Sequence, residues 1–460
     1  MKRHALALAL LGAGCSSPPA QTTPAVSPED PDIPKAAPRG QFTTPVATEE
    51  PRGLISPTGT FGVETYRKRR RALMDKVGSS AALITQDMVW SGDRQGMDFY
   101  YLTGLEEPGG ALLLAPAAKA NHEWLFLATR NEERERWSGE RAMLPSKALE
   151  VALGISRIAR EQGLNGALIG ACNNDGGLAY VGDFTAPPKE NPRALDLIKK
   201  TREHTLSCPV KDLHGTLARM REVKEPEELA LMRKAIKYTA AGHAVALKAV
   251  HPGAHEFEVK DAIEDGFRRA GSRHLSYESI TGSGPNGAVL HYPKDDRTMK
   301  DGELIVIDAA GEAELYAADV TRTLPVGGKY TKEQRDIYEI VLRAQQAGIA
   351  AAKAGVTVDE IDRATRKVIT EAGYYDYYLH ACCHFVGLQV HDAGDYQAPL
   401  PANAVITVEP GIYLPQRGFG VRIEDEILIT EAGAEVLTKD IPKDPDEIER
   451  LMAAPAAPAN

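Results

Sequence analysis

Apolar and polar residues alternate in blocks along most of this chain, and the blocks have two different periods. Residues 81–84, 111–114 and 167–169 form short apolar runs, whereas residues 131–137 are polar with helical spacing. Strands covered on both faces give short continuous apolar runs, and surface helices give apolar residues three or four positions apart. The alternation of both kinds of block predicts a small α/β domain, which we place at 61–217.

A second set of blocks runs from residue 218 to about residue 440. Pro226 stands at the first turn of a predicted helix, with Leu229, Met232 and Ile236 at helical spacing after it. Two segments farther on match each other at a constant offset of 102 residues, and each predicts a helix that ends in glycine and precedes strands. The matched positions are Gly253, Glu258, Val259, Ala262 and Gly271, and Gly355, Glu360, Ile361, Ala364 and Gly373. This repeat predicts two related αββ halves.

The first domain opens on a basic run, Tyr66 to Arg71. Such a run can bind an acidic partner. Because it leads into Ala72, Leu73 and Met74 at helical spacing, we instead expect it to be the solvated face of a first helix.

Size and charge limit the classes of protein and partner. With 460 residues, 43% of them hydrophobic, the chain exceeds one ordinary core, so two folded domains are expected. A formal net charge of −10 argues against nucleic acid as a partner, because phosphate binding needs a basic surface. No interior stretch is apolar for long enough to span a bilayer.

Residues 1–15 have the pattern of an export signal. A basic start, an apolar stretch at 5–11 and small residues directly before Cys15 are similar to a bacterial lipoprotein signal, in which Cys15 becomes lipidated. An ordinary secretory signal with an incidental cysteine is the alternative. We therefore expect an exported lipoprotein of the bacterial cell envelope that faces the periplasm, with the choice between inner and outer membrane left open.

Residues 16–60 are rich in Pro, Thr, Ala and Ser and have no apolar periodicity. Such a segment cannot bury enough apolar surface to fold, so we expect a disordered tether between the lipid anchor and the first domain. At the other end, we assign residues 441–460 to a C-terminal tail.

Four cysteines remain besides Cys15, and an even number in an exported protein permits disulfides. A bridge between Cys172 and Cys208 is compatible with this count. A bridge between the neighbours Cys382 and Cys383 would be strained, so we expect both to be packed thiols near the candidate metal site.

Four acidic residues of the second domain suggest metal chemistry. The first of them ends the apolar run 304–307, and the third ends the run 404–408. For any one acid alone, an unrelated position at a strand end is the simpler interpretation, but a carboxylate there is unfavourable unless it is paired or binds a cation. With the histidine-rich segment 380–391 between the pairs, they form the ligand set of a two-metal hydrolytic site. The four are Asp308, Asp319, Glu409 and Glu424.

The charge of this set predicts the number and kind of ions. One divalent ion would leave four carboxylates with an excess of negative charge, whereas two divalent ions balance them. Oxygen ligands with one imidazole suit Mn²⁺, Co²⁺ or Zn²⁺ better than a metal that prefers thiolates.

His380 and His384 are spaced so that a helix would place them on one face, as in the helix of zinc proteases. However, no glutamate follows His380, and Gly387 with its apolar neighbours indicates extended structure. We expect His384 to be a metal ligand and His380 to lie beside the ligands.

Several long motifs follow one another along the chain. They are Asp98-Phe99-Tyr100-Tyr101-Leu102-Thr103-Gly104, Val289-Leu290-His291-Tyr292, Asp308 with Asp319-Val320-Thr321-Arg322-Thr323, the His-x-x-x-His-x-x-Gly-x-x-x-His-Asp run from His380, Thr407-Val408-Glu409-Pro410-Gly411-Ile412-Tyr413, and Arg422-Ile423-Glu424-Asp425-Glu426. In this combination the chain resembles the Xaa-Pro aminopeptidases (aminopeptidase P) of the pita-bread metallopeptidase family M24, over most of residues 61–440.

The resemblance implies an α/β N-terminal domain followed by a pita-bread catalytic domain with pseudo-twofold αββ halves. It implies two divalent ions, with Mn²⁺ preferred and Co²⁺ or Zn²⁺ as alternatives. Asp308 would chelate one ion, His384 and Glu409 would complete the other, and Asp319 and Glu424 would bridge them.

The resemblance also implies an activity. Glu409 would take a proton from the attacking water, while His291 and His391 would steady the substrate side and help protonate the leaving nitrogen. The substrates would be peptides with proline in second position, and the chain would form a homo-oligomer, a dimer or a tetramer.

Arg422 has a role that the residues themselves suggest. Residues two apart on a strand point to one face, so Arg422 is expected beside Glu424, where it can hold a nearby carboxylate by charge-assisted hydrogen bonds. A surface ion pair is the alternative.

Ala381 and Gln389 depart from the family pattern, which has glycine and often aspartate at these places. Neither is a ligand, so we expect a changed pocket shape and unchanged chemistry. A proline dipeptidase with the same metal centre remains a rival. A creatinase-like amidinohydrolase and a non-catalytic pita-bread module are disfavoured because all five ligand positions are filled. The segment Tyr100 to Gly104 favours an aminopeptidase that acts on peptides longer than two residues.

Overall fold

The computed structural model describes residues 60–86, 97–174, 176–180, 192–205 and 207–454. Cys15 and, apart from Thr60, the tether predicted at 16–60 lie outside the described residues, so both remain predictions. Within the described part of the chain, no helix combines the length and the apolar character that a membrane crossing requires.

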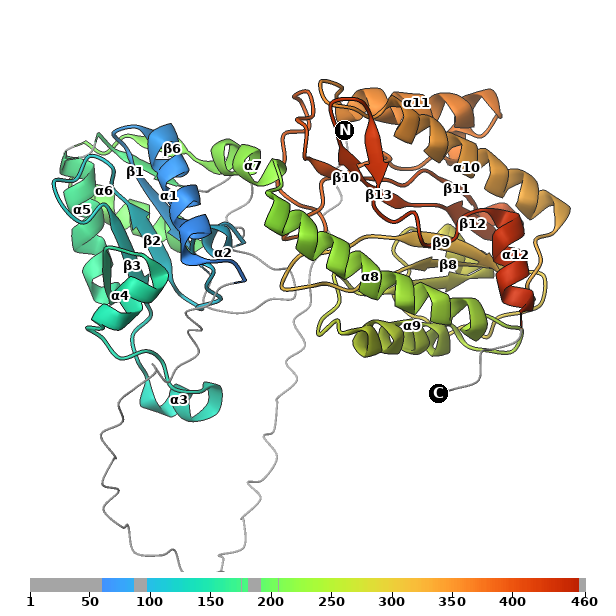
Figure 1. The fold of residues 1–460 in the computed structure, drawn as a ribbon, viewed down its shortest axis with the longest axis horizontal. Coiled ribbons are helices and arrows are strands. Elements are labelled where there is room, and N and C mark those ends of the chain that lie inside the picture. Colours follow the sequence, from blue (N-terminus) through green and yellow to red (C-terminus); the bar gives the residue numbers. More distant parts are fainter. Residues whose placement is uncertain (1–59, 87–96, 175, 181–191, 206, 455–460) are drawn as a thin grey trace, which may run out of the picture. The chain divides into compact units, whose positions relative to one another are not determined.

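A six-stranded sheet forms the centre of the first domain (Figure 1). Its strand order is β4-β3-β2-β1-β5-β6, with β2 antiparallel to both of its neighbours and the other pairs parallel. The strands are β1 (Ala81–Thr85), β2 (Ala111–Leu114), β3 (Glu123–Leu127), β4 (Arg157–Arg160), β5 (Leu178–Tyr180) and β6 (Val210–Asp212). The helices are α1 (Val63–Val77), α2 (Met97–Thr103), α3 (Glu132–Ser138), α4 (Lys147–Leu153), α5 (Leu164–Asn174) and α6 (Pro192–Glu203), with a 3-10 turn at Glu161–Gly163.

Both faces of this sheet are covered, which explains the continuous apolar runs. Along β1, Ala82 and Ile84 pack in one core cluster, while Ala81 and Leu83 pack in another on the opposite face. The run 167–169, which the sequence suggested as strand-like, is part of helix α5 instead. Three apolar residues do not distinguish a buried strand from the buried face of a helix, so this expectation was wrong.

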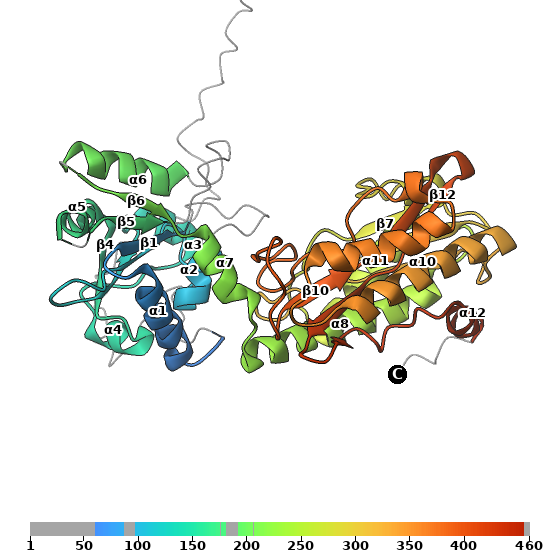
Figure 2. The same cartoon turned by 90° about the horizontal axis from the view of Figure 1, so that it is seen from above.

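Two helix pairs, each followed by antiparallel strands, build the second domain, and the helices α10 and α11 lie side by side in both views (Figure 1, Figure 2). The linking helix α7 (His214–Glu222) precedes them. The first half contains α8 (Pro226–Ala249), α9 (Glu256–Ala270), β7 (Ile280–Ser283), β8 (Leu304–Asp308) and β9 (Thr321–Pro325). The second half contains α10 (Lys332–Ala351), α11 (Val358–Glu371), β10 (Val405–Val408), β11 (Gly411–Leu414), β12 (Phe419–Arg422), β13 (Asp425–Ile429) and β14 (Ala434–Val436). Short 3-10 turns lie at Gly284–Ala288, Tyr375–Tyr377 and Pro415–Arg417.

The halves follow the sequence repeat. Gly271 directly follows the last residue of α9, and Gly373 lies two residues after the end of α11; both glycines have a positive φ. Helices α8 and α9 touch at two other glycines, because a Cβ atom on Gly266 would lie 2.7 Å from the Cα of Gly242. Past the second half, α12 (Pro445–Ala453) buries Ile448, so the segment assigned to a C-terminal tail contains a packed helix.

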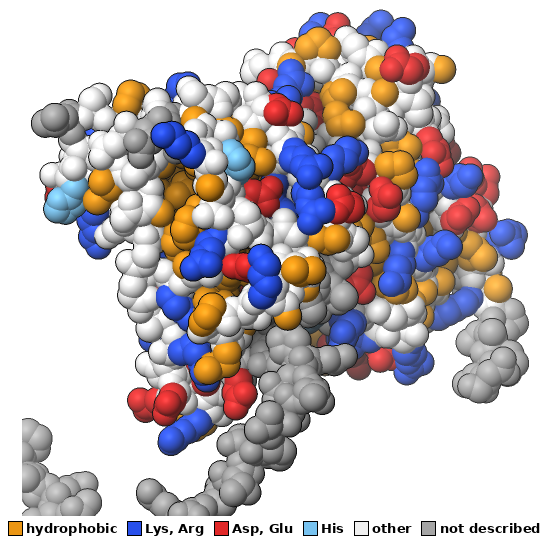
Figure 3. Space-filling view, turned by 60° about the vertical axis from the view of Figure 1, so that its left-hand side comes forward, with side chains coloured by type: hydrophobic (Ala, Val, Ile, Leu, Met, Phe, Trp, Pro, Cys, Tyr) orange, Lys and Arg blue, Asp and Glu red, His pale blue; other side chains and the backbone are white. Residues whose placement is uncertain are grey.

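The cysteines lie as the sequence suggested. Cys172 of α5 and Cys208 form a disulfide bond. Cys382 and Cys383 are free and buried. On the face shown in Figure 3, Lys and Arg side chains are interspersed with Asp and Glu.

The basic run of α1 differs from the expectation of a solvated face. Arg69 and Arg70 are 3% and 0% exposed. Arg69 forms an ion pair with Glu225 at 2.8 Å, and Arg70 donates to the carbonyl oxygen of Gly154 at 2.8 Å. Both arginines share a helix face with apolar residues, because positions three and four apart lie together. The positive charge of Arg69 and Arg70 was therefore a misleading guide to which face of α1 is exposed.

Replacing Arg70 with methionine, which is similar in length, should lower the free energy of unfolding by about 2–4 kcal/mol. The carbonyl oxygens of Leu102 and Gly154 would remain buried without this donor. Arg71→Met, on the exposed side of the same helix, is the matched control and should change the free energy by less than about 0.5 kcal/mol. Urea denaturation followed by circular dichroism measures both. Equal shifts would contradict the buried role of Arg70.

Candidate metal centre

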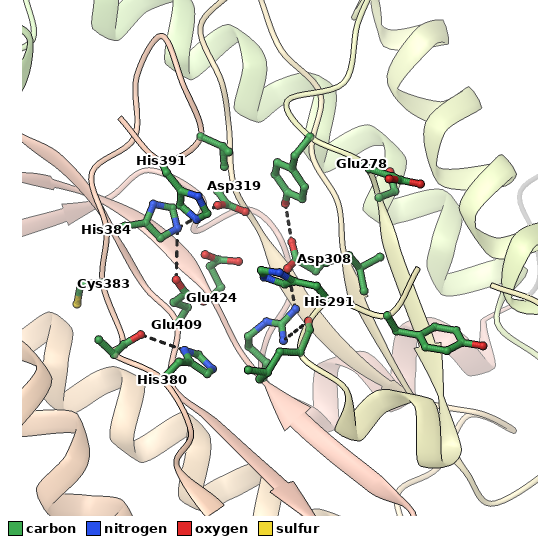
Figure 4. Close-up of a pocket in the computed structure, with 18 of the residues that line it drawn as sticks. Glu278, His291, Asp308, Asp319, His380, Cys383, His384, His391, Glu409 and Glu424 are labelled. Carbon is green, nitrogen blue, oxygen red and sulfur yellow. Dashed lines mark hydrogen bonds and ion pairs between the residues drawn. The ribbon is translucent and has the colours of Figure 1, made fainter. Parts of the chain in front are cut away.

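A cavity of about 490 Å³ in the second domain is lined by residues from both halves (Figure 4). Every site residue that the sequence suggested in this domain lines it. These residues are His291, Asp308, Asp319, His380, His384, His391, Glu409, Arg422 and Glu424.

Strand ends place the four acids. Asp308 is the last residue of β8 and pairs with Thr321 of β9, and Asp319 stands just before β9. In the second half, Val408 of β10 pairs with Asp425 of β13. Glu409 and Glu424 are the next residues beyond that pair. Each half therefore contributes two carboxylates from the same end of an antiparallel strand pair.

His384 faces two of these acids. Its Nε2 lies 3.3 Å from Asp319 Oδ2 and 3.3 Å from Glu409 Oε1. Its Nδ1 lies 3.1 Å from the carbonyl oxygen of Phe385, which can only accept, so Nδ1 carries a proton and donates. This arrangement turns Nε2 toward the carboxylates, as a metal-binding imidazole requires. Asp319, His384 and Glu424 each offer a ligand atom, and these atoms lie within 4.8 Å of one another.

The pKa values reflect crowded, buried negative charge. Burial raises the pKa of Asp319 to about 6, and burial together with Asp319 raises the pKa of Glu424 well above its ordinary value. Burial alone would raise the pKa of Glu409 as well, but the hydrogen bond with His384 lowers it to about 2. Burial would lower the pKa of His384, yet its hydrogen bonds with Asp319 and Glu409 raise it. In the metal-free chain, a proton on Nε2 therefore stands where a metal cation would bind.

The donor set fits two divalent ions. Among the described residues that line the cavity, Arg422 is the only Arg or Lys. The four carboxylates of the candidate ligand set therefore face one permanent cation, while the fifth lining carboxylate, Glu278, is exposed. One divalent ion together with Arg422 would leave a negative charge in a buried site, whereas two divalent ions match the four negative charges of the ligand carboxylates. Four carboxylates and one imidazole match the ligand preferences of Mn²⁺, Co²⁺ and Zn²⁺.

Arg422 holds a nearby carboxylate, as the sequence suggested, and the structure identifies this carboxylate as Asp308. Its Nη2 lies 2.6 Å from Asp308 Oδ2. Tyr277 donates from its hydroxyl to the other oxygen of Asp308 at 2.6 Å. Glu424 instead accepts from the hydroxyl of Thr321 at 2.7 Å. These partners set the direction in which each carboxylate faces the cavity.

The same guanidinium reaches His380 through Tyr413. Nη1 of Arg422 donates to the Tyr413 hydroxyl at 3.0 Å, and this hydroxyl lies 2.7 Å from Nε2 of His380. Nδ1 of His380 lies 3.0 Å from the carbonyl oxygen of Ala381, so Nδ1 is the donor and Nε2 accepts from Tyr413. Both ring nitrogens of His380 are engaged within the protein, which agrees with its predicted place beside the ligands.

The other two histidines line the cavity without belonging to this network. The rings of His384 and His391 lie 4.3 Å apart, edge to face. Partial burial and the neighbouring His384 lower the pKa of His391, so it is neutral at neutral pH. His291 lines the cavity from the first half.

Residues 230–431 match the family model of Metallopeptidase family M24, and residues 66–168 match that of Aminopeptidase P, N-terminal domain. The chain is 35% identical to the Xaa-Pro aminopeptidase of Escherichia coli (strain K12), over 85% of this chain and 98% of the relative. The chain belongs to metallopeptidase family M24.

Two further relatives are informative. Zn-substituted E. coli aminopeptidase P in complex with product matches with a TM-score of 0.75 and 32% identity, over 85% of this chain and 98% of that chain. The Xaa-Pro dipeptidase of Pyrococcus furiosus is 36% identical over 54% of this chain and 72% of the relative. The expected fold class, a small α/β domain followed by a pita-bread domain, is confirmed.

Sequence reasoning did not assign roles to four side chains around the acids. Thr321 and Tyr413 hold Glu424 and His380, and Thr407 accepts from the backbone N–H of His384 at 3.1 Å. These three residues stand inside the motifs, so the sequence could have indicated that they lie near the site. Tyr277 stands outside every motif, and the contact with Asp308 emerges from the structure alone.

Metal binding by this M24 chain should weaken as pH falls. Asp319 must be ionised to bind a metal ion, and its pKa of about 6 means that a proton competes for it below pH 6. From this group alone, the apparent affinity should be about tenfold weaker at pH 5 than at pH 7, and the raised pKa of Glu424 acts in the same direction. Competition with a metal indicator, calibrated separately at each pH, measures the affinity. An affinity that stays constant over this range would contradict the assignment.

Proposed function

We propose that this chain is a metal-dependent aminopeptidase that removes one N-terminal residue from peptides with proline in second position. One observation carries the choice of an aminopeptidase over a dipeptidase. Among the described residues that line the cavity, Arg422 is the only Arg or Lys, and Asp308 and Tyr413 already engage it. A dipeptidase must bind a carboxylate directly after proline, for which a cationic side chain is the usual partner.

The relatives support the same choice. The aminopeptidase of E. coli matches through the first domain as well as the second, whereas the dipeptidase of P. furiosus matches 54% of this chain. The dipeptidase remains the second candidate because its identity over the matched part, 36%, is as high. A creatinase-like hydrolase or a non-catalytic module gains no support, since all five ligand residues face one cavity.

The residues divide the reaction among themselves. Asp308, Asp319, His384, Glu409 and Glu424 would hold two divalent ions, which when bound lower the pKa of a water molecule and polarise the carbonyl before proline. Glu409 has a low pKa, is ionised at neutral pH, and would take the proton of the attacking water. The proline nitrogen has no hydrogen of its own, so it needs a proton as it leaves. The proton that Glu409 takes from the water would supply this need, and His291 and His391, which line the cavity, would help to relay it.

We propose Mn²⁺ as the native metal, with Co²⁺ and Zn²⁺ as alternatives. The predominance of carboxylate oxygen in the ligand set supports a hard or borderline ion. A zinc-substituted form of a relative indicates that related sites accept more than one kind of metal ion.

We also propose that the chain is a lipoprotein of the bacterial cell envelope, anchored at Cys15 and tethered by residues 16–60. The signal-like pattern of residues 1–15 supports export. The disulfide between Cys172 and Cys208 supports it independently, because such bonds persist in oxidising compartments. A homo-oligomer, dimer or tetramer, stays a prediction.

The specificity should separate peptide classes. With equal N-terminal residues, kcat/KM for Xaa-Pro-Yaa-Zaa should exceed that for the Xaa-Pro dipeptide by about tenfold or more, because the described lining offers no spare cation for a carboxylate after proline. Xaa-Ala-Yaa-Zaa is the control for the proline requirement and should be cleaved far more slowly. A clear preference for the dipeptide would make the chain a dipeptidase. Equal kcat/KM values for the alanine and proline peptides would contradict the proposed proline specificity but not the proposed metal centre.

Cys15→Ser should abolish acylation and leave the precursor either unprocessed or released from the membrane fraction. The thiol of Cys15 is the atom that a lipid would modify, and a hydroxyl does not replace it. Mass spectrometry of the N-terminal peptide and fractionation of cells measure the two effects. Cys172→Ser is a control that should leave acylation unchanged. A Cys15→Ser protein that remains acylated and membrane-bound would contradict the anchor.

A further inference from the structure

A buried ion network stands next to the metal centre and has no part in the mechanism above. Asp392 directly follows His391 in sequence, and its side chain is 2% exposed. Its Oδ1 accepts from Nη2 of Arg221, and its Oδ2 accepts from Lys224 at 3.1 Å. Arg221 and Lys224 come from the linking helix α7 and the turn after it.

The network also reaches the first domain. Nη1 of Arg221 donates to Asp98 at 2.8 Å, and Nη2 donates to Gln389 at 3.1 Å. Two cations therefore meet two carboxylates, Asp98 and Asp392, in a buried setting. Such a network is sensitive to the loss of one partner, because the remaining charges would stay desolvated and unpaired.

The backbone of Asp392 connects this network to the metal-facing histidine. Its N–H donates to the carbonyl oxygen of Phe385 at 2.8 Å. That same oxygen accepts the Nδ1–H of His384. One carbonyl group thus closes the loop 385–392 and orients His384, while Asp392 anchors the loop from its far end.

The loop is packed too closely to shift freely. A Cβ atom on Gly387 would lie 2.1 Å from Oδ2 of Asp392 and 2.9 Å from Cε of Lys224. Only glycine leaves that space to the ion pair, which gives a physical reason for the glycine of the histidine motif. The carboxylate and the loop therefore restrict each other.

We propose that Asp392, held by Arg221 and Lys224, is a positioning residue that fixes the loop 385–392 and with it the ring of His391 in the cavity. This inference rests on the proposed function only in that His391 contacts the substrate. Gln389, which differs from the family pattern, also accepts a hydrogen bond from Arg221. This departure from the pattern therefore affects the contacts of Arg221 and not the candidate metal ligands.

The test is a double-mutant cycle at saturating metal. Asp392→Asn should lower kcat for an Xaa-Pro-Yaa-Zaa peptide by about 10–100-fold, the usual effect of removing a partner that orients an active-site group. In a His391→Ala background the same change should lower kcat by less than about threefold, because the group it positions is already gone. Asp395→Asn is the matched control. It lies three residues farther on and meets Arg219 at 3.4 Å outside the network, and it should leave kcat unchanged.

A second measurement needs no substrate. Hydrogen exchange followed by mass spectrometry should show faster exchange of the amides of residues 385–392 in Asp392→Asn and not in Asp395→Asn. Equal loss of kcat in both backgrounds, or unchanged exchange, would overturn the proposal. If Asp392→Asn does not fold, Arg221→Lys, which keeps the charge and loses the forked contact, replaces it in both measurements. An inactive wild type would refute the proposed function, while the exchange result would still decide the positioning role.

Discussion

Four carboxylates that line one cavity with a single guanidinium are the constraint on which the second domain depends. Their burial is unfavourable by itself, and the raised pKa values of Asp319 and Glu424 express this. Several neighbouring polar groups offset this cost: Arg422 and Tyr277 hold Asp308, Thr321 holds Glu424, and His384 lies against the other two acids. The arrangement is complete only when divalent cations supply the remaining positive charge.

Two of the four histidines that line the cavity are oriented by the same kind of hydrogen bond. His380 and His384 each donate Nδ1–H to the carbonyl oxygen of the residue that follows, Ala381 or Phe385. In both, Nε2 is thereby left to face outward, toward Tyr413 in one case and toward the carboxylates in the other. The backbone therefore sets which ring nitrogen faces away from it, and two histidines four positions apart face different partners, Tyr413 for His380 and two carboxylates for His384.

Sequence reasoning recovered the two repeated helices and the four acids of the second domain, because the acids stand at strand ends and the two halves repeat. It failed where the outcome depends on tertiary packing. The partner of Arg422 is an example: the sequence predicted a nearby carboxylate, but only the tertiary packing shows that it is Asp308, 114 positions away. Arg69 and Arg70 are another, since a buried arginine is recognised only by the carboxylate or carbonyl group that comes from elsewhere in the chain.

The same division of the site between two halves has a consequence for how the protein folds. The ion pair between Arg422 and Asp308 joins residues 114 positions apart, and neither half contains a full set of ligands. Loop closure over such a distance is entropically unfavourable, so contacts of this kind form late. A nascent chain that has emerged only as far as α10 contains Asp308 and Asp319 but not yet Arg422. The complete set of candidate ligands therefore exists only after the strands of the second half have packed against those of the first.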